Sequence, residues 1–342
     1  MSVLLPFCDS FDHYDQQGDK WDVAGPNSSI NLSGTASRTG IGALLFASGV
    51  EGPKINFAAG ILSRVVAGTA FYPDGAGGVP KSNIMMLWDS TTNNQQVRVC
   101  ALATNAIIIF SGNDPFPSQL GQSAPGVLDA NSYNYIEVDA TISHSATVIV
   151  RVNGVVVLTL TGVDTQVAGS NPGADQFQLW GYGGASVSRH DDVYVLDPVA
   201  AIGDAFLGAV NVYAVTPTAN AAPLQWTPLS GQNFENVDEI PPDGDTSYNF
   251  SNTVGQVDQY VYNSTGVPTS SQIQFVQHTL DAKVDSGSRS IASNAGGVTG
   301  GTDFVLTSGY TMYKTPYETN PLTGDPWVGA DFPADFGPEV TA

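Results

Sequence analysis

The chain has 342 residues, a net charge of −21 and no apolar stretch long enough to span a bilayer. Its 11 Lys and Arg residues against 32 Asp and Glu residues argue against binding to nucleic acid or to an anionic membrane surface. The content of Gly (37 residues) and Pro (21 residues) is typical of a β protein with many turns.

Short β-branched runs between turn residues predict strands throughout the first half of the chain, and no long run has helical periodicity. The strongest local signal is Asn153-Gly154, a dipeptide typical of a two-residue hairpin turn, which joins predicted strands at 147–152 and 155–160. Just before it, residues 133–142 alternate between polar and apolar side chains, which indicates a strand with one face on a core. Further strands are predicted at 42–47, 63–72, 83–89, 95–101, 106–110, 176–181 and 191–196. This number of strands predicts a large antiparallel β-sandwich.

Asp197-Pro198 ends the last of these strands and predicts a domain boundary near residue 200. We expect a sandwich domain at 1–198, a linker at 199–207 and a second, smaller β-sandwich domain at 208–342. No Lys or Arg occurs between Arg189 and Lys283, so the second domain begins with an anionic surface. Its predicted strands are 209–215, 258–262, 271–282 and 308–314.

The motifs of common hydrolases are incomplete in this sequence. Glu137 and Asp139 occupy the first two positions of the Glu-x-Asp-x-Glu motif of glucanases, but Thr141 stands where the second Glu is required. No Gly-x-Ser-x-Gly motif occurs. The four histidines lie in unrelated sequence contexts: His13, His144, His190 and His278. We therefore predict that the protein is not an enzyme.

Two segments are rich in Asp, whose carboxylate oxygens suit Ca²⁺. The better candidate is Asp243-Gly244-Asp245, where Asp243 and Asp245 would be the metal ligands. The other candidate is a group near the N-terminus: Asp9, Asp12, Asp15, Asp19 and Asp22. Because Asx turns also gather Asp residues, we expect no cofactor and keep Ca²⁺ as the alternative.

Trp180 and Tyr182 are the candidate ligand-binding residues, because they flank a glycine at the end of a predicted strand that runs into a Gly-rich loop. Aromatic rings in such a place can pack on the C–H groups of a sugar. The alternative for Trp180 is a core position, since a sandwich of this size needs large side chains inside. Trp88 alternates with its neighbours as a core residue.

Two sets of sequence segments carry a resemblance to a known family. In the first half they are Asp9-Ser10-Phe11-Asp12-His13-Tyr14, Trp21, Gly40-Ile41-Gly42, the hairpin at Asn153-Gly154, and residues 191–197 followed by Phe206-Leu207-Gly208. In the second half they are Trp226-Thr227-Pro228, residues 236–239, 241–248, 322–327 and 336–342. These segments resemble bacteriophage virion structural proteins whose N-terminal domain has the fold of concanavalin A-like lectins and laminin-G modules.

The resemblance implies a concanavalin A-like jelly roll and a location in the virion, after synthesis in the cytoplasm of the host bacterium. We expect a tail-associated fibre, spike or adaptor that displays its lectin-like domain and attaches to the particle through its C-terminal domain. The alternatives are a head decoration protein that stabilises the capsid, and a glycan-binding or glycan-cleaving module. The expected partners are tail, collar or capsid proteins, further copies of this chain, commonly as a trimer, and a host surface glycan, without nucleic acid or membrane insertion.

Overall fold

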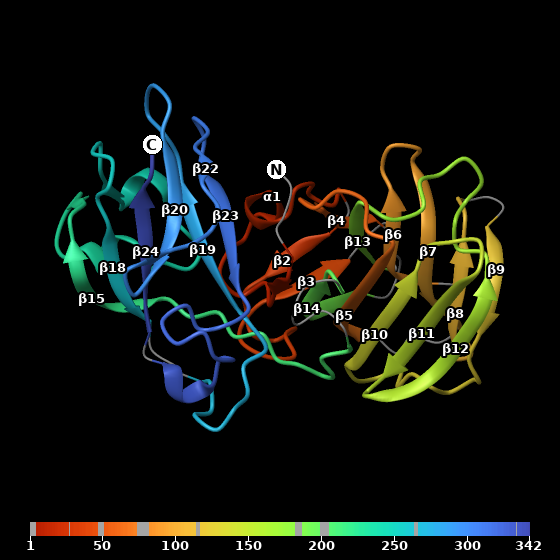
Figure 1. The fold of residues 1–342 in the computed structure, drawn as a ribbon. Coiled ribbons are helices and arrows are strands. Elements are labelled where there is room, and N and C mark those ends of the chain that lie inside the picture. The colour runs from red at the N-terminus through yellow and green to blue at the C-terminus, as the bar shows by residue number, and fades with distance from the viewer. Residues whose placement is uncertain are drawn as a thin grey trace. The chain divides into compact units, whose positions relative to one another are not determined.

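The computed structural model describes all residues except 1–4, 27, 47–50, 74–81, 114–116, 182–186, 199–204, 263–265 and 333. The described secondary structure is nearly all β, in antiparallel sheets, which confirms the predicted fold class (Figure 1). The chain divides into two compact units, Met1–Val212 (unit 1) and Tyr213–Ala342 (unit 2). Within the described ranges, no helix is long and apolar enough to cross a membrane.

The first sheet of unit 1 has eight strands and contains the predicted hairpin. Its order is β12 (Val155–Val163), β11 (Ala146–Val152), β10 (Asn134–Thr141), β5 (Arg64–Tyr72), β14 (Ser188–Leu196), β3 (Ala43–Phe46) and β2 (Ser29–Asn31), with β1 (Phe7–Asp9) paired to β14. Asn153 and Gly154 form the turn between β11 and β12, and both have positive φ angles (51° and 79°), as this hairpin turn requires.

The second sheet of unit 1 has six strands. Its order is β4 (Glu51–Asn56), β13 (Gln176–Trp180), β6 (Ser82–Asp89), β7 (Asn94–Ala101), β8 (Ile107–Ser111) and β9 (Ser118–Gln122). A short helix, α1 (Gln17–Lys20), lies in the N-terminal segment between β1 and β2. Every strand predicted for the first half is present, with ends that differ by a few residues.

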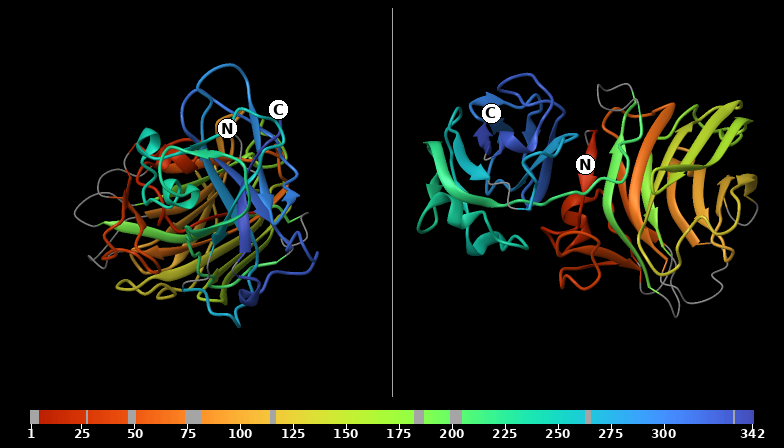
Figure 2. Two further views of the ribbon diagram at one scale, coloured as in Figure 1. Left: turned by 90° about the vertical axis from the view of Figure 1, so that its left-hand side faces the viewer. Right: turned by 90° about the horizontal axis from the view of Figure 1, so that it is seen from below.

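The two sheets of unit 1 pack against each other across an apolar core (Figure 2). A Cβ atom at Gly52 or Gly181 of the second sheet would lie 2.5 or 2.2 Å from ring atoms of Phe46, which belongs to the first sheet. At the other side of the sandwich, Leu160 of β12 lies over Gly121 of β9. These glycines therefore let large side chains of one sheet reach the backbone of the other.

Residues 205–212 at the end of unit 1 form no strand. Their backbone groups bind side chains of the first sheet instead: Gly208 N donates to Glu137 Oε1 (2.8 Å) and Val212 N donates to Asp192 Oδ1 (2.7 Å). The predicted strand at 209–215 is therefore wrong, because these amides satisfy carboxylates and not a neighbouring strand. Of the predicted linker at 199–207, residues 199–204 lie outside the described residues.

The carboxylates that hold this segment are themselves buried. Asp192 also accepts hydrogen bonds from Arg38 Nη1 and Thr39 Oγ1, and Asp191 accepts from the backbone N–H groups of Arg38 and Thr39. Burial and the adjacent charge of Asp192 raise the pKa of Asp191 to about 8. Segment 205–212 thus belongs to the sandwich of unit 1 through a network of charge-assisted hydrogen bonds.

Unit 2 contains a six-stranded sheet, two two-stranded sheets and three short 3₁₀ helices among its described residues. The large sheet has the order β15 (Pro217–Leu224), β18 (Asp258–Tyr262), β24 (Ala334–Val340), β20 (Ser290–Ala295) and β21 (Val298–Thr299), with β22 (Phe304–Val305) paired to β20. The other elements are the pairs β19 (Val276–Ala282) with β23 (Thr311–Tyr317) and β16 (Thr227–Pro228) with β17 (Asn249–Phe250), and the helices η1 (Asn233–Asn236), η2 (Gly244–Thr246) and η3 (Gly329–Asp331).

Unit 2 has an aromatic core that includes Tyr317, Trp327 and Phe336. His278 of β19 lies in this core, with its ring 5.2 Å from that of Phe336. Its Nδ1 atom is 2.6 Å from Ser293 Oγ, which is 2.7 Å from the hydroxyl of Tyr317. Burial lowers the pKa of His278 to about 3, so its imidazole is neutral in the folded protein at neutral pH.

This buried imidazole should make unit 2 less stable in mild acid. The unfolded chain binds a proton at His278 below a pH of about 6.5, whereas the folded chain does so only near pH 3, so the free energy of unfolding falls as pH drops between these values. From pH 7.5 to pH 5 we expect a loss of about 2 kcal/mol from this group. Urea unfolding of the wild type and of His278→Asn at both pH values measures it. An identical pH dependence in the two proteins would contradict the prediction.

Candidate functional site

The outer face of the six-stranded sheet of unit 1 is the face that points away from the eight-stranded sheet. Gly181 and Leu179 face inward, because the position of a Cβ atom at Gly181 is occupied by the ring of Phe46. Side chains alternate along a strand, so Gln178 and Trp180 of β13 face outward.

The strand register places outward side chains in rows across the sheet. In the central row Gln178 lies opposite Lys54 and Met86, Met86 lies opposite Arg98, and Arg98 lies opposite Phe110. This row therefore combines two cations, an amide, a thioether and an aromatic ring. The inward face of the same strands is apolar and fully buried: Phe177, Leu179, Leu87, Val97 and Ile109.

A second row lies beside the first. Gln176 lies opposite Asn56 and Trp88, and Trp88 lies opposite Gln95. The side-chain amide of Gln176 donates to Asn56 Oδ1 (2.7 Å). The outer face thus carries polar and aromatic side chains in neighbouring positions on five strands, and most of these side chains are buried.

Two tryptophans lie on this face, in an apolar cluster with Met86. The indoles of Trp88 and Trp180 are 8% and 7% exposed. The Lys54 ammonium is 4.9 Å from the centre of the Trp88 ring, within the range of a cation–π interaction. We call Trp88, Trp180, Gln95 and Gln178 the outer-face site.

The outer-face site holds buried polar atoms whose hydrogen-bonding capacity is unused. In the described part of the chain, no group accepts from Trp88 Nε1 or Trp180 Nε1, and no group donates to Gln95 Oε1 or Gln178 Oε1. The amide of Gln178 is oriented by its Nε2 atom, which donates to the carbonyl of Gly52 (3.0 Å). A buried polar atom without a partner costs about 1–3 kcal/mol, and these four lie on three adjacent strands of one sheet, β13, β6 and β7.

The sequence singled out one residue of this site and overlooked the rest. Trp180 lies at the end of β13 within the packed cluster, and Tyr182 lies outside the described residues, so their role in ligand binding stays a prediction. Trp88 was expected to be a core residue, and it is buried in the apolar cluster with Met86 and Trp180, on the outer face of its sheet. The alternation Gln176-Phe177-Gln178-Leu179-Trp180, with amides and indole on one side, is the signal that could have located the site.

The two Asp residues proposed to hold Ca²⁺ are bound to different partners. Asp243 Oδ1 accepts from the backbone N–H (3.2 Å) and the hydroxyl (2.8 Å) of Ser247. Asp245 Oδ1 accepts from Lys283 Nζ (2.6 Å) and from the hydroxyl of Tyr310. Asp245 would have to leave Lys283 to bind a cation, so this pair does not fit a calcium site as it stands.

The N-terminal Asp residues also have separate hydrogen-bond partners. Asp12 Oδ1 accepts from the backbone N–H groups of Ile41 and Gly42, and burial raises the pKa of Asp12. Asp22 Oδ2 accepts from the N–H of Asn56. Among the residues that the structure describes, no three His, Cys, Asp or Glu side chains are grouped so that they could hold a metal ion.

Glu137 and Asp139 lie on β10 of the other sheet and have separate partners. Glu137 is fully buried, and its Oε1 atom accepts from the hydroxyl of Tyr194 (2.6 Å) as well as from Gly208 N. Asp139 forms an ion pair with Arg64 (2.8 Å). The alternation predicted both carboxylates on the polar face of a strand, but Glu137 is fully buried and each of the two binds its own partners within unit 1.

Comparison with known proteins gives similarities of fold only. No protein family and no curated protein matches the sequence. Among solved structures, the endo-β-1,4-glucuronan lyase of the fungus Trichoderma reesei is 13% identical, with a TM-score of 0.40 over 55% of this chain and 94% of that one. An alginate lyase from a Chlorella virus is 14% identical (TM-score 0.37; 53% and 94%), and a carbohydrate esterase from the Shiga toxin-encoding bacteriophage phi24B is 14% identical (TM-score 0.34; 55% and 98%).

These structures are carbohydrate-active β-sandwich proteins, and they correct one prediction. The sequence led us to predict that the protein is not an enzyme, but sandwiches of this kind include lyases and an esterase. The prediction that the protein is not an enzyme, which was based on incomplete motifs, is therefore wrong. At these identities the likeness assigns no reaction to this chain.

Proposed function

We propose that unit 1 binds a carbohydrate at the outer-face site. The observation that carries the proposal is a cluster of two indoles around Met86, whose N–H groups and the nearby amide oxygens of Gln95 and Gln178 have no hydrogen-bond partner among the described residues. A sugar matches this set, because its C–H groups pack on indole and each hydroxyl group both donates and accepts a hydrogen bond. A purely apolar ligand would leave all four polar atoms without partners.

Binding should be visible in the fluorescence of the protein. Trp88 and Trp180 are more than nine-tenths buried, so a ligand that reaches them changes the surroundings of both indoles. Trp21 is held by Asp9 in a separate buried network of unit 1 and Trp327 lies in the aromatic core of unit 2, so neither belongs to the outer-face site.

A panel of soluble neutral and uronic acid polysaccharides tests the proposal by fluorescence titration. For a polysaccharide that binds, we expect Gln178→Ala to weaken binding about ten-fold, because a hydroxyl of the ligand loses its acceptor. Trp180→Phe keeps a smaller aromatic ring and removes the N–H donor, so it should give at least a similar loss.

The matched control is Gln16→Ala, an exposed glutamine of the same unit outside the sheet. Equal affinities for Gln178→Ala and the control would contradict the proposed site, as would the absence of binding to every polysaccharide. Release of reducing ends in the same mixtures shows whether a bound glycan is also cleaved.

We further propose that the protein is a component of a bacteriophage particle, where unit 1 would present its glycan site and unit 2 would attach to other virion proteins. The support is the resemblance of sequence segments in both halves, above all those at 236–248 and 322–327. Quantitative mass spectrometry of purified virions against the major capsid protein tests it. A few copies per particle would favour a tail position, many would favour capsid decoration, and absence from the virion would overturn the proposal.

A further inference from the structure

The two-stranded ribbon β16–β17 of unit 2 has an unusual distribution of polar and apolar side chains. Thr227 pairs with Phe250 and Pro228 with Asn249, and the backbone bond from Leu229 N to Tyr248 O (2.9 Å) continues the ribbon. Since directly opposed residues share a face and faces alternate, four side chains lie on one face. We call Thr227, Leu229, Tyr248 and Phe250 the ribbon face.

The opposite side of the ribbon is anchored to unit 2 by polar contacts. The side-chain amide of Asn249 donates to the carbonyl of Asn233 and to the hydroxyl of Tyr260, both at 2.8 Å. Asn233 and Tyr260 are 7% and 3% exposed, so Asn249 points into the unit.

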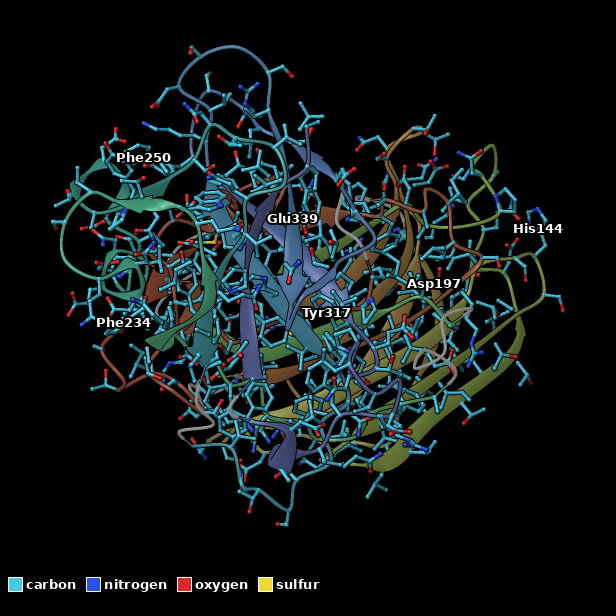
Figure 3. The ribbon with its side chains drawn as sticks, turned by 60° about the vertical axis from the view of Figure 1, so that its left-hand side comes forward. His144, Asp197, Phe234, Phe250, Tyr317 and Glu339 are labelled. Carbon is cyan, nitrogen blue, oxygen red and sulfur yellow. The ribbon has the colours of Figure 1, made fainter. Side chains whose placement is uncertain are left out.

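The ribbon face is therefore the outward one, and it is apolar. Leu229 and Phe250 are 45% and 50% exposed, and the rings of Tyr248 and Phe250 lie 6.2 Å apart. In Figure 3, Phe250 lies at the outer edge of unit 2. An ordinary surface ribbon has its apolar side inward, so this reversed pattern marks a surface that another molecule covers.

The charges at the Tyr248 end of the ribbon face are negative. Glu239 Oε1 and Asp243 Oδ1 both accept from Ser247 Oγ (2.7 and 2.8 Å), immediately before Tyr248 in the chain. Of the cations that follow the ribbon in the sequence, Lys283 is paired with Asp245 (2.6 Å) and Arg289 Nη2 donates to the carbonyl of Asn252 (3.5 Å), beyond the Phe250 end. A second copy with the Tyr248 ends opposed would bring these carboxylates together, so charge at this end favours a different partner with a basic border.

We propose that the ribbon face docks another protein whose contact surface has an apolar pocket bordered by Lys or Arg residues. Leu229 and Phe250 would enter the pocket, while Glu239 and Asp243 would face the basic border. Burial of the two exposed side chains supplies affinity, and the charges fix the orientation. This inference is independent of the carbohydrate site of unit 1.

The probe is a random dodecapeptide library, selected on the immobilised full-length chain in low salt. Selected peptides are synthesised and titrated by fluorescence anisotropy against the wild type, Phe250→Ser and the control Val305→Ser, a 64% exposed residue of the same unit. We expect the peptides to combine an aromatic or branched residue with Lys or Arg. They should bind Phe250→Ser at least ten-fold more weakly, bind the control normally and weaken as salt is raised.

Circular dichroism confirms that each variant is folded, which is expected because both replaced side chains are exposed. The proposal is overturned if no peptide is enriched, if the peptides bind Phe250→Ser as tightly as wild type, or if acidic peptides are selected. Sedimentation velocity adds one more outcome: self-association that Phe250→Ser abolishes would assign the face to a second copy and overturn the proposed partner.

Discussion

Replacement of Asp9 by alanine is expected to lower the free energy of unfolding of unit 1 by about 3–5 kcal/mol. Asp9 is fully buried, and its carboxylate accepts from Lys20 Nζ (3.1 Å), Trp21 Nε1 (2.7 Å), the hydroxyl of Tyr14 and the N–H of Phe11. Without Asp9, the ammonium of Lys20, which is 3% exposed, would remain buried but would have lost its negatively charged partner. Urea unfolding followed by tryptophan fluorescence measures the loss.

The control for this variant is Asp164→Ala, which removes an exposed contact between Asp164 Oδ1 and His144 Nδ1 (3.0 Å) from the same unit. That change should leave the unfolding midpoint nearly unchanged, because both side chains are exposed and solvent can replace the contact. Similar midpoints for the two variants would show that the buried network around Asp9 adds little to stability.

The second large effect is expected for Gly337→Ala in unit 2. A Cβ atom at Gly337 would lie 1.8 Å from the carbonyl oxygen of Asp258 and 2.8 Å from its carbonyl carbon, both backbone atoms that cannot rotate away. Gly337 is in β24, which is hydrogen-bonded to β18 and β20, so relief of the clash must separate central strands. We expect a loss of about 3 kcal/mol, measured by urea unfolding.

Gly301→Ala is the matched control in the same unit, because no atom lies within 4 Å of a Cβ at that position and its φ is not in the left-handed region. The control should unfold like the wild type. If Gly337→Ala also did so, β24 would have to be free to shift, and the close approach to Asp258 would not restrict the sheet.

Unit 1 was predictable from sequence where strands alternate and end in clear turns. Residues 133–142 and the hairpin at Asn153-Gly154 became β10, β11 and β12 in the expected order. Their side-chain pattern is a direct consequence of a sheet with one face on a core, so local sequence carries the information.

Unit 2 was less predictable because its central strands have little local signal. β20 (Ser290–Ala295) is small and polar, and β24 contains Gly337-Pro338, residues that normally weaken or interrupt strands. Both are buried by the packing of distant segments, which no local pattern reveals. The predicted strands at 271–282 and 308–314 exist in shifted form, as β19 and β23.

The candidate site was predictable only in part, for a similar reason. Residue type identified Trp180 as a possible ligand platform, but which side of a strand faces the other sheet depends on contacts such as that of Phe46 with Gly181. Likewise Asp243 and Asp245 are close in sequence, yet Asp245 pairs with Lys283, 38 positions away. In each example the position of the side chain depends on a residue that is distant in the sequence.

The attachment of residues 205–212 to the sandwich affects where unit 1 can be cut from the chain. A fragment that stops at residue 198 would expose the Glu137 and Asp192 carboxylates and remove the amides of Gly208 and Val212 that bind them. A fragment that runs to Val212 keeps both bonds and ends where the compact unit ends. Isolation of unit 1 as a separate domain, for tests of the proposed carbohydrate site, should therefore start from residues 1–212.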